Sequence, residues 1–498
     1  MSYIFDIVAI FTALFGVVYA FFQWRFRHWE RKGLPYLKPT FPFGNAPNPI
    51  THRARRGDVA LTWYKEMKKL GLKHAGVFGF HKPLYVVIDP DYIKSILIKD
   101  FQHFTDRGQF HDENADPLSV NLFTLDGQEW KQLRYKLTPT FTSGKIKRMF
   151  DTLVQCTGPF IEAMDKMIDE EEPIDIKEML ARYTTDVIGS CAFGIECNNF
   201  KNPNSEFRKH GANAFAGRSL IKVFILFLRN EFPRLASILR IKEMDKEGRD
   251  FFMRMVKDTI DYREKNGVKR DDYLQMLMKL RDENHWSFAQ VASQSLIFFF
   301  AGFETSSTTM TFALYELCRH PEMQRKVHEE VTGVLAKNDG KFTYENLKEM
   351  TYLQQVLDET LRLRSPAEAL ARVCSKDYPL PGTNAIIDKG TTVMVPVKGL
   401  HSDPDYFPDQ EKFDPERFSP ENKAKMKSCV YLPFRDGPRN CIGLRFGILQ
   451  SKLGLAVLLK NYYFTINNKT IQPIRMCTDT LVPSIEGGLW LNGKKIKD

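Results

Sequence analysis

One cysteine of the chain stands in a local sequence that suits ligand chemistry. Cys441 follows the segment 434–440, FRDGPRN, and precedes an apolar pattern that predicts a helix over 444–459. Gly437 and Gly443 permit a tight turn with the backbone close to the sulfur, and the helix N-terminus favours the thiolate over the thiol. A lone cysteine is usually a small buried apolar residue. Here the spacing instead predicts a thiolate ligand to a haem iron, which favours O–O bond cleavage.

A second group with reactive potential lies midway along a helix predicted over 287–319. Ala301 and Thr305 share one face of this helix, and Ala301 with Gly302 leaves room for a flat cofactor and a small ligand. We expect the Thr305 hydroxyl to bond to the carbonyl of residue 301. Beside an iron it would hydrogen-bond a bound dioxygen and relay protons supplied by Glu304. A hydroxyl that only caps its own helix is the competing interpretation, and the thiolate loop favours the catalytic one.

Charged side chains elsewhere are predicted to support these groups. Glu359 and Arg362 lie three residues apart on a helix, and Arg417 follows in a segment rich in aromatic residues and proline. If the three meet, they form a buried network that fixes the segment leading to the cysteine. Such a network is structural rather than catalytic. A haem also carries two propionates that need donors, and the candidates are Trp130, Arg134, Arg372 and Arg439.

The composition limits the possible classes of protein. The chain has 498 residues, 43% of them hydrophobic, which is enough for one large core or for two to three ordinary domains. Its eight cysteines are scattered without a C-x-x-C pair, as expected for reduced thiols in a protein that faces the cytosol. The net charge of +10 suits an anionic partner. No polybasic arm or nucleic-acid module is present in the sequence, so a membrane is favoured over nucleic acid.

The first residues predict a membrane anchor. Residues 4–22 are mainly apolar and would span about 28 Å as a helix, close to the thickness of the hydrocarbon core. Lysine and arginine follow this segment but do not precede it, which predicts a cytoplasmic location for the remainder, and the Asn468 sequon should stay unmodified. A cleaved signal peptide would need a basic start and a small-residue cleavage site. We therefore predict an anchor over 1–24, a basic, proline-rich linker over 25–45 and one catalytic domain over 46–498.

The periodicity predicts a mainly helical protein with a small β portion. A β-hairpin is predicted from 77–80 and 84–88. Further extended segments are expected near 392–396 and within 462–491, so that both ends of the chain contribute strands. A second membrane span over 287–319 is disfavoured, because Glu304 would then lie in lipid. The other helices are predicted over 128–137, 178–193, 242–266, 321–336 and 353–364.

Five stretches resemble the signatures of the cytochrome P450 superfamily. They are the cysteine loop, residues 301–305 (AGFET), residues 359–362 (ETLR), residues 415–418 (PERF) and residues 130–134 (WKQLR). The segments 105–119 and 137–145 are similar to insect microsomal members that oxidise xenobiotics. The resemblance covers the whole chain and implies the cytochrome P450 fold, with a single large haem domain behind the anchor.

The resemblance also implies a function. It implies haem b bound through Cys441, with Phe434 and Gly443 among the cofactor-binding residues, and insertion of one oxygen atom from O2 into lipophilic substrates. These substrates would be xenobiotics such as plant toxins or insecticides, or endogenous lipids or hormones. Electrons would come from NADPH through NADPH–cytochrome P450 reductase, with cytochrome b5 as an additional partner, at the endoplasmic reticulum membrane.

Two other functions are weighed against this one. A haem-thiolate isomerase or dehydratase acts on peroxides without a reductase and has no need of a relay through Glu304 and Thr305. A poorly active haem carrier or ligand sink is the non-enzymatic alternative. Dependence on NADPH would exclude the first, and multiple turnover would exclude the second.

The chain departs from the family pattern in three places. Arg435 replaces the glycine that usually follows Phe434, where a bulky cation would strain the turn or tilt the haem pocket. Residues 364–366 (RSP) stand where an aromatic residue and two prolines are common, and Gln410 stands where proline is common. Our hypothesis is that Arg435→Gly raises haem occupancy.

Substrate and partner contacts are predicted only by segment. The apolar stretch 220–228 is too short to span a bilayer but long enough to enter its interface. A basic face for an acidic flavin domain is expected from Lys131, Lys136, Lys423, Lys425, Lys427 and Arg435, with plainly solvated lysines as the alternative. The candidate substrate contacts, each more often an ordinary core residue, are Phe123, Phe215, Phe224, Phe298, Leu370, Leu481 and Val482.

Overall fold

The structure, a computed structural model, describes residues 2–48, 54–215, 217, 219–383 and 385–496. The chain forms two compact units, each built from separate stretches of sequence. Helices dominate and strands are few, so the predicted fold class is confirmed. The first unit comprises Met1–Gly108, Ala367–Gln410 and Lys427–Asn440, and the second comprises Gln109–Pro366, Glu411–Met426 and Cys441–Asp498.

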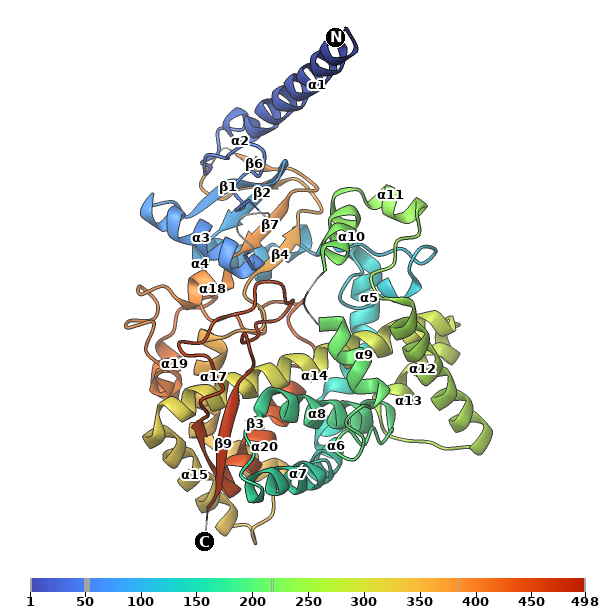
Figure 1. The fold of residues 1–498 in the computed structure, drawn as a ribbon, viewed down its shortest axis with the longest axis vertical. Helices are drawn as coiled ribbons and strands as arrows, with labels where there is room; N and C mark the ends of the chain where they lie inside the picture. Colours follow the sequence, from blue (N-terminus) through green and yellow to red (C-terminus); the bar gives the residue numbers. More distant parts are fainter. Residues whose placement is uncertain (1, 49–53, 216, 218, 384, 497–498) are drawn as a thin grey trace. The chain divides into compact units, whose positions relative to one another are not determined.

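The predicted hairpin organises the sheet of the first unit. β1 (His74–Gly79) and β2 (Lys82–Val87) pair in antiparallel fashion. β2 pairs in parallel with β7 (Thr392–Val395), and β7 pairs in antiparallel fashion with β4 (Leu370–Val373). Apolar side chains of these strands form much of the buried core of the unit. The sheet therefore joins two segments that lie far apart in the sequence (Figure 1).

The other elements of the first unit are short, apart from the N-terminal helix and α3 (Arg56–Lys69). Residues Tyr3–Phe26 of the N-terminal helix are long and apolar enough to cross a membrane, with a mean hydropathy of 2.3. Near its C-terminal end, Phe22 and Phe26 are instead buried in the core of this unit. The elements are α1 (Ser2–Phe26), α2 (His28–Arg31), α3 (Arg56–Lys69), α4 (Pro90–Lys94), η1 (Ser95–Lys99), η2 (Phe101–His103), β5 (Tyr378–Pro379), β6 (Ile386–Ile387) and α18 (Val397–His401).

The second unit is arranged around α14 (Phe288–Arg319), the long helix coloured yellow in Figure 1. The Ser287 hydroxyl accepts a hydrogen bond from the Gln290 backbone, and the Gln290 side chain accepts one from the Ser287 backbone. This capping box confirms the predicted start of the helix. α8 (Ile176–Ile188) and α20 (Leu444–Asn461) pack against α14 and bury much of its surface.

The remaining helices of the second unit surround this centre. They are η3 (Pro117–Ser119), α5 (Gly127–Leu137), η4 (Thr138–Phe141), α6 (Ser143–Gln155), α7 (Thr157–Asp169), η5 (Gly189–Phe193), α9 (Glu206–Phe215), α10 (Leu220–Glu231), α11 (Pro233–Ile238), α12 (Lys246–Asn266), α13 (Tyr273–Asn284), α15 (Pro321–Ala336), α16 (Tyr344–Glu349), α17 (Thr351–Leu363), η6 (Pro415–Phe418) and α19 (Pro420–Lys425).

Two predicted helices differ in detail from the structure. The helix predicted over 178–193 is an α-helix to Ile188 and continues as a π-helix over Gly189–Phe193, after which Gly194 adopts a left-handed φ of 63°. The helix predicted over 242–266 begins only at Lys246. The Asp245 side chain accepts a hydrogen bond from the backbone of residue 248 and so caps the helix there.

A second sheet confirms that both ends of the chain contribute strands. β3 (Ile174–Asp175) pairs with β9 (Trp490–Lys495), which pairs with β8 (Tyr462–Ile466). The C-terminal strands thus pair with a segment from the middle of the second unit, and the N-terminal hairpin pairs with β7. Only the two ends of the extended segment expected within 462–491 form strands, because its interior residues follow loops and turns.

Candidate functional site

The loop before Cys441 requires glycine at one position. Gly437 has a φ of +75°, and a Cβ atom there would lie 1.9 Å from the backbone oxygen of Leu97. Both facts exclude a side chain, because a backbone oxygen cannot move aside cheaply. The Asp436 carboxylate accepts a hydrogen bond from the Gly437 N–H at 2.7 Å and closes the turn. The prediction of a tight turn at Gly437 is therefore confirmed.

Cys441 itself begins the last segment of the second unit, three residues before α20. It is exposed, whereas four of the other seven cysteines are buried. Burial lowers the pKa of Arg134, and the negative charge of the Cys441 thiolate opposes this shift. Gly443 differs from expectation, because its φ of −89° suits any residue and a Cβ atom would meet only Phe141 at 3.9 Å. The polypeptide alone therefore does not require glycine at 443.

A cluster of arginines in the first unit tests whether this chain fits a haem. Arg372 is 1% exposed; its Nη1 donates to the Ala371 carbonyl, and its Nε and Nη2 have no hydrogen-bond partner among the described residues. Burial, together with the charges of Arg435 and Arg439, lowers the pKa of Arg372 to about 9. Buried cations of this kind need an anion. Two propionates would supply one, so these residues fit the group.

Arg435 occupies unusual backbone as well as an unusual position in the family pattern. Its φ is +65°, in the left-handed region that favours glycine. Its N–H donates to the Leu432 carbonyl at 3.0 Å and holds it in the turn. The residue is half-buried, and its charge acts on Arg372. The structure thus gives a physical basis for strain at this residue.

The Ala301 face of α14 has the predicted hydroxyl geometry. The Thr305 Oγ1 donates to the Ala301 carbonyl at 2.7 Å. Ala301 is exposed although residues on the other faces of this turn are buried. Gly302 plays a different part from the one expected, because a Cβ atom there would lie 2.4 Å from the end of the Ile188 side chain. Gly302 makes room for α8 rather than for a cofactor.

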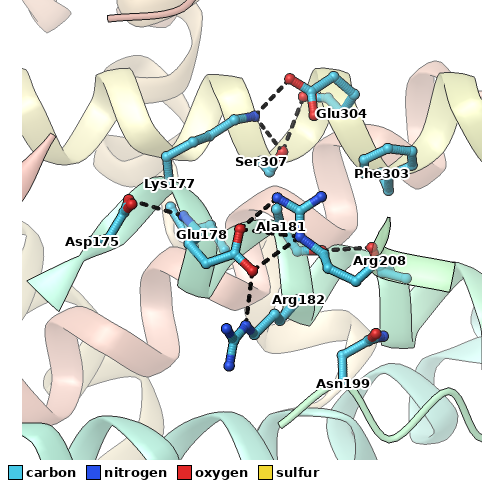
Figure 2. Close-up of polar contacts among 12 residues, drawn as sticks. Asp175, Lys177, Glu178, Ala181, Arg182, Asn199, Arg208, Phe303, Glu304 and Ser307 are labelled. Carbon is cyan, nitrogen blue, oxygen red and sulfur yellow. Dashed lines mark hydrogen bonds and ion pairs between the residues drawn. The ribbon is translucent and has the colours of Figure 1, made fainter. Parts of the chain in front are cut away.

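The Glu304 carboxylate is paired to a cation that the sequence did not reveal. Lys177, on α8, places its Nζ 2.9 Å from Glu304 Oε1 (Figure 2). The same Nζ donates to the hydroxyls of Ser307 and Thr308 at 2.8 and 2.9 Å. The Glu304 side chain is 12% exposed and that of Lys177 is 22% exposed. Glu304 is therefore a charged partner of α8 as well as a neighbour of Thr305.

The predicted arginine–carboxylate network is assembled in the second unit. Arg362 donates through Nε and Nη2 to the two oxygens of Glu359 at 2.7 and 2.8 Å, and both side chains are fully buried. Arg417 Nε lies 3.5 Å from Glu359 Oε1, and the Asp414 N–H donates to the same oxygen at 2.9 Å. This fork-matched pair holds the segment of η6 against α17. Its geometry matches the structural role expected from the sequence.

The remaining predicted contacts are spread over both units. Trp130 and Arg134 lie on α5 in the second unit, with Trp130 buried, whereas Arg372 and Arg439 lie in the first. Arg439 is buried and donates to the Thr105 carbonyl. Phe434 is half-buried in the first unit.

The candidate substrate contacts are equally mixed. Phe298 stacks on Tyr273 with ring centres 4.4 Å apart and touches Phe141 and Phe446, which is the environment of a core residue. Leu370 and Val482 are buried, in the first and second unit respectively. Phe123, Phe215, Phe224 and Leu481 lie in the second unit and keep more exposed surface. Their role in substrate binding stays a prediction.

Two residues that sequence reasoning missed hold α14 in place. Lys177 is described above. Gln450, on α20, donates through Nε2 to the Gly302 carbonyl at 2.8 Å and to the Ser306 hydroxyl. Each contact joins helices far apart in the sequence, so no local pattern could reveal it. The one available signal was a polar residue within an otherwise apolar helix face.

This protein is mainly helical, with a cysteine just before one helix and an acid and a hydroxyl on a long central helix. These features are typical of a haem-thiolate oxygenase. Residues 51–490 match the family model of cytochrome P450. The chain therefore belongs to the cytochrome P450 family, and it is a haem-dependent monooxygenase that uses O2. Members of this family in general work with redox partners.

Several similar proteins come from Drosophila melanogaster. Probable cytochrome P450 6a14 is 41% identical, with 98% of this chain and 99% of that protein covered. Cytochrome P450 6a2 is 39% identical, with 99% and 100% covered. Probable cytochrome P450 6a20 is 41% identical, with 98% and 100% covered. The predicted resemblance to insect members is confirmed.

Proposed function

We propose that this monooxygenase oxidises lipophilic compounds with electrons from NADPH, delivered by NADPH–cytochrome P450 reductase, and that cytochrome b5 is an additional partner. The observation that carries this proposal is the acid–alcohol pair of Glu304 and Thr305 beside the exposed Ala301 on α14. A haem-thiolate isomerase or dehydratase has no use for such a pair. A ligand sink does not need one either.

Each residue has a stated part in the proposed reaction. Cys441 would bind the iron of haem b, and Arg372 and Arg439, with Trp130 and Arg134, would hold its propionates. When bound, the haem supplies the oxygen-activating chemistry. Thr305 already donates its proton to the Ala301 carbonyl, so its hydroxyl oxygen is left to accept. Glu304 would supply protons to this hydroxyl.

The proposed substrates are xenobiotics such as plant toxins or insecticides, or endogenous lipids or hormones. Support comes from α10 and α11, which expose Ile221, Phe224, Ile238 and Leu239 to the extent of 72, 59, 78 and 59%. Apolar surface of this extent suits a lipid interface. Lipid-soluble compounds would then reach the protein from the bilayer.

The proposed location is the endoplasmic reticulum membrane, with the catalytic part in the cytoplasm. We retain the division into an anchor over 1–24, a linker over 25–45 and a haem-thiolate monooxygenase domain over 46–498. The apolar helix α1 and the lysines and arginines that follow it support this arrangement. A sugar on Asn468 of the full chain expressed in microsomes would contradict the orientation.

The docking face that we propose for a reductase contains fewer lysines than the sequence suggested. Lys423 and Lys427 already pair with Asp358 and Asp91 at 3.1 and 3.2 Å, which leaves less charge for a partner. Lys131 and Lys425 of the second unit are exposed, and we propose that they bind the acidic surface of the reductase. Electron transfer should slow as salt rises, since screening acts beyond about 8–10 Å. Transfer that does not depend on salt would contradict it.

The function is tested with the full chain, reductase and NADPH. A fluorogenic alkyl aryl ether, whose dealkylation releases a phenol, is a suitable lipophilic probe. We expect a thiolate-type carbon monoxide difference spectrum and NADPH-dependent product over many turnovers, and Cys441→Ser should lose both. Peroxide conversion without NADPH would favour the isomerase instead. A Cys441→Ser protein that keeps the spectrum and the product would refute the proposal.

Arg435→Gly is proposed to raise haem occupancy. Relief of the left-handed strain is worth about 1 kcal/mol, and removal of the charge eases the repulsion on Arg372. Haem per polypeptide, measured by absorbance after extraction, is the readout. Arg435→Lys keeps both strain and charge and should show no gain. Equal or lower occupancy in the glycine variant would count against this idea.

A further inference from the structure

The ammonium of Lys177 is fully engaged on α14. Its three N–H donors have three acceptors within 2.9 Å. Figure 2 shows the Glu304 carboxylate and the Ser307 hydroxyl, and the third acceptor is the Thr308 hydroxyl. Lys177 comes from the first turn of α8, which packs along α14. The ammonium of Lys177 on α8 is thus paired directly with the Glu304 carboxylate on α14.

The geometry ties this cation to the acid–alcohol pair. Glu304 directly precedes Thr305, and the two side chains leave α14 on neighbouring faces. The Thr305 hydroxyl lies on the Ala301 face, whereas the Glu304 carboxylate turns to α8. Whatever fixes the carboxylate on the α8 side therefore controls how the acid reaches the alcohol.

A small cavity adjoins the same cation. It has a volume of about 20 Å³ and is bounded by Lys177, by Thr308 and Thr311 of α14, and by the C-terminal segment at Ser484 and Gly488. A volume of this size holds about one water molecule. Most of its lining is apolar, and Lys177, Thr308, Thr311 and Ser484 supply the polar groups to which such a water can bond. Lys177 thus lies between this cavity and Glu304.

The chemistry of lysine suits a proton donor better than a fixed strut. Burial lowers the pKa of Lys177, although Glu304 acts to raise it. Unlike an arginine, which stays charged, a lysine with a lowered pKa can release a proton and regain it. A purely structural pair at this place would be served by either residue.

We propose that Lys177 is a positioning residue that orients Glu304 and passes protons to it from the adjoining cavity. The proposal rests on the monooxygenase function above. Insertion of one oxygen atom from O2, with the other leaving as water, consumes two electrons from NADPH and two protons. For each proton, the Lys177 ammonium protonates the Glu304 carboxylate and becomes an amine; a cavity water then gives a proton to the amine and takes one from solvent, so that ammonium and water are both restored. Glu304 hands its proton on towards Thr305 and is again a carboxylate.

The test uses the full chain with reductase, NADPH and the fluorogenic ether. Lys177→Met removes the charge and the N–H donors. We expect product per NADPH to fall about tenfold or more, with the electrons released as hydrogen peroxide, and a larger solvent deuterium isotope effect on product formation. Arg182→Met is the matched control, since Arg182 also pairs with a carboxylate, but with that of Glu178 on its own helix α8. It should keep the ratio of product to NADPH.

The outcomes distinguish proton transfer through Lys177 from a purely structural role of this residue. If Lys177→Met only lowers the melting temperature and keeps product yield and isotope effect, the proposal is wrong. Lys177→Arg keeps the charge, and so the fold, but cannot release a proton; it should lose yield as well, and full yield would overturn proton transfer through residue 177. It also carries the test if the methionine variant does not retain haem. A wild-type chain without NADPH-dependent product would refute the proposed function itself.

Discussion

Two pairs of buried charges in the second unit differ in how tightly they are enclosed. Glu359 and Arg362 are fully buried and are joined by two parallel hydrogen bonds, with Arg417 and the backbone of Asp414 on the same carboxylate. Glu304 meets a single lysine that keeps 22% of its side chain exposed beside a cavity. The cation of the first pair stays charged, and further donors hold its carboxylate. The second pair has both a titratable cation and access to water.

The comparison shows that the role of a buried ion pair depends on whether its cation is an arginine or a lysine. The arginine fork fixes geometry, because it is always charged and its planar donors match a carboxylate. The lysine holds its acid by one oxygen and can change its charge. Substitutions should therefore harm stability in the first pair and the use of electrons in the second.

The largest effect is expected for Glu359→Gln. This change leaves Arg362 buried without a counter-charge, which costs about 3–5 kcal/mol. The free energy of unfolding from a urea titration is the measurement. Glu416, which pairs with Lys326 on the surface, provides the control, and Glu416→Gln should cost less than about 1 kcal/mol. Similar losses for both variants would remove the distinction between buried and exposed pairs.

Exchanging the two cations sharpens the comparison. Arg362→Lys loses the fork and leaves buried donors and acceptors unmatched, at a cost of about 1–3 kcal/mol. Lys177→Arg should change the free energy of unfolding by less than about 1 kcal/mol. Product per NADPH, measured on protein that retains haem, should stay normal in Arg362→Lys and fall in Lys177→Arg. A normal product yield in Lys177→Arg and a lower one in Arg362→Lys would contradict a proton relay through Lys177.

A smaller, graded effect is expected with pH. Lys177 is faced by Glu304 on α14, Glu178 on α8 and Arg208 on α9, and burial lowers its pKa. Because the ammonium is the donor, product per NADPH should fall as pH rises through this lowered pKa, before an exposed lysine titrates near 10.4. Over the same range the unfolding free energy should rise, since the folded state binds fewer protons than the unfolded chain. Lys177→Met should show neither trend.

The smallest effect is expected for Arg182→Met. Arg182 lies 2.9 Å from Glu178 one turn away on α8 and is 21% exposed, while Arg208 pairs with the same carboxylate. Loss of such a pair costs about 0.3–0.5 kcal/mol. Thermal unfolding is the readout. A loss as large as that of Glu359→Gln would show that exposure does not separate the two pairs.

Local sequence explains most of what could be predicted. The start of α14 follows from the Ser287 cap, and the turn before Cys441 follows from Gly437, because each depends on residues close in sequence. The pairing of β2 with β7 and the contact of Lys177 with Glu304 join distant segments, so periodicity could not reveal them. The π turn after Ile188 also escaped prediction, because it continues the apolar pattern of α8.

The assignment of glycines shows the same limit within one motif. Gly302 and Ala301 are neighbours, and the sequence suggested one role for both. In the structure Ala301 is exposed, whereas Gly302 faces Ile188. Which face of a helix meets a neighbour depends on packing between helices, and a single motif does not contain that information.

The contact of Gly302 with Ile188 constrains how this protein can evolve. A methyl group at 302 must displace the end of the isoleucine side chain, so a shorter residue at 188 would make a larger residue at 302 easier to accommodate. Ala301 is exposed, so a larger side chain there does not meet this obstacle. A substitution at 301 is therefore free of this packing constraint, whereas one at 302 depends on the size of the side chain at 188.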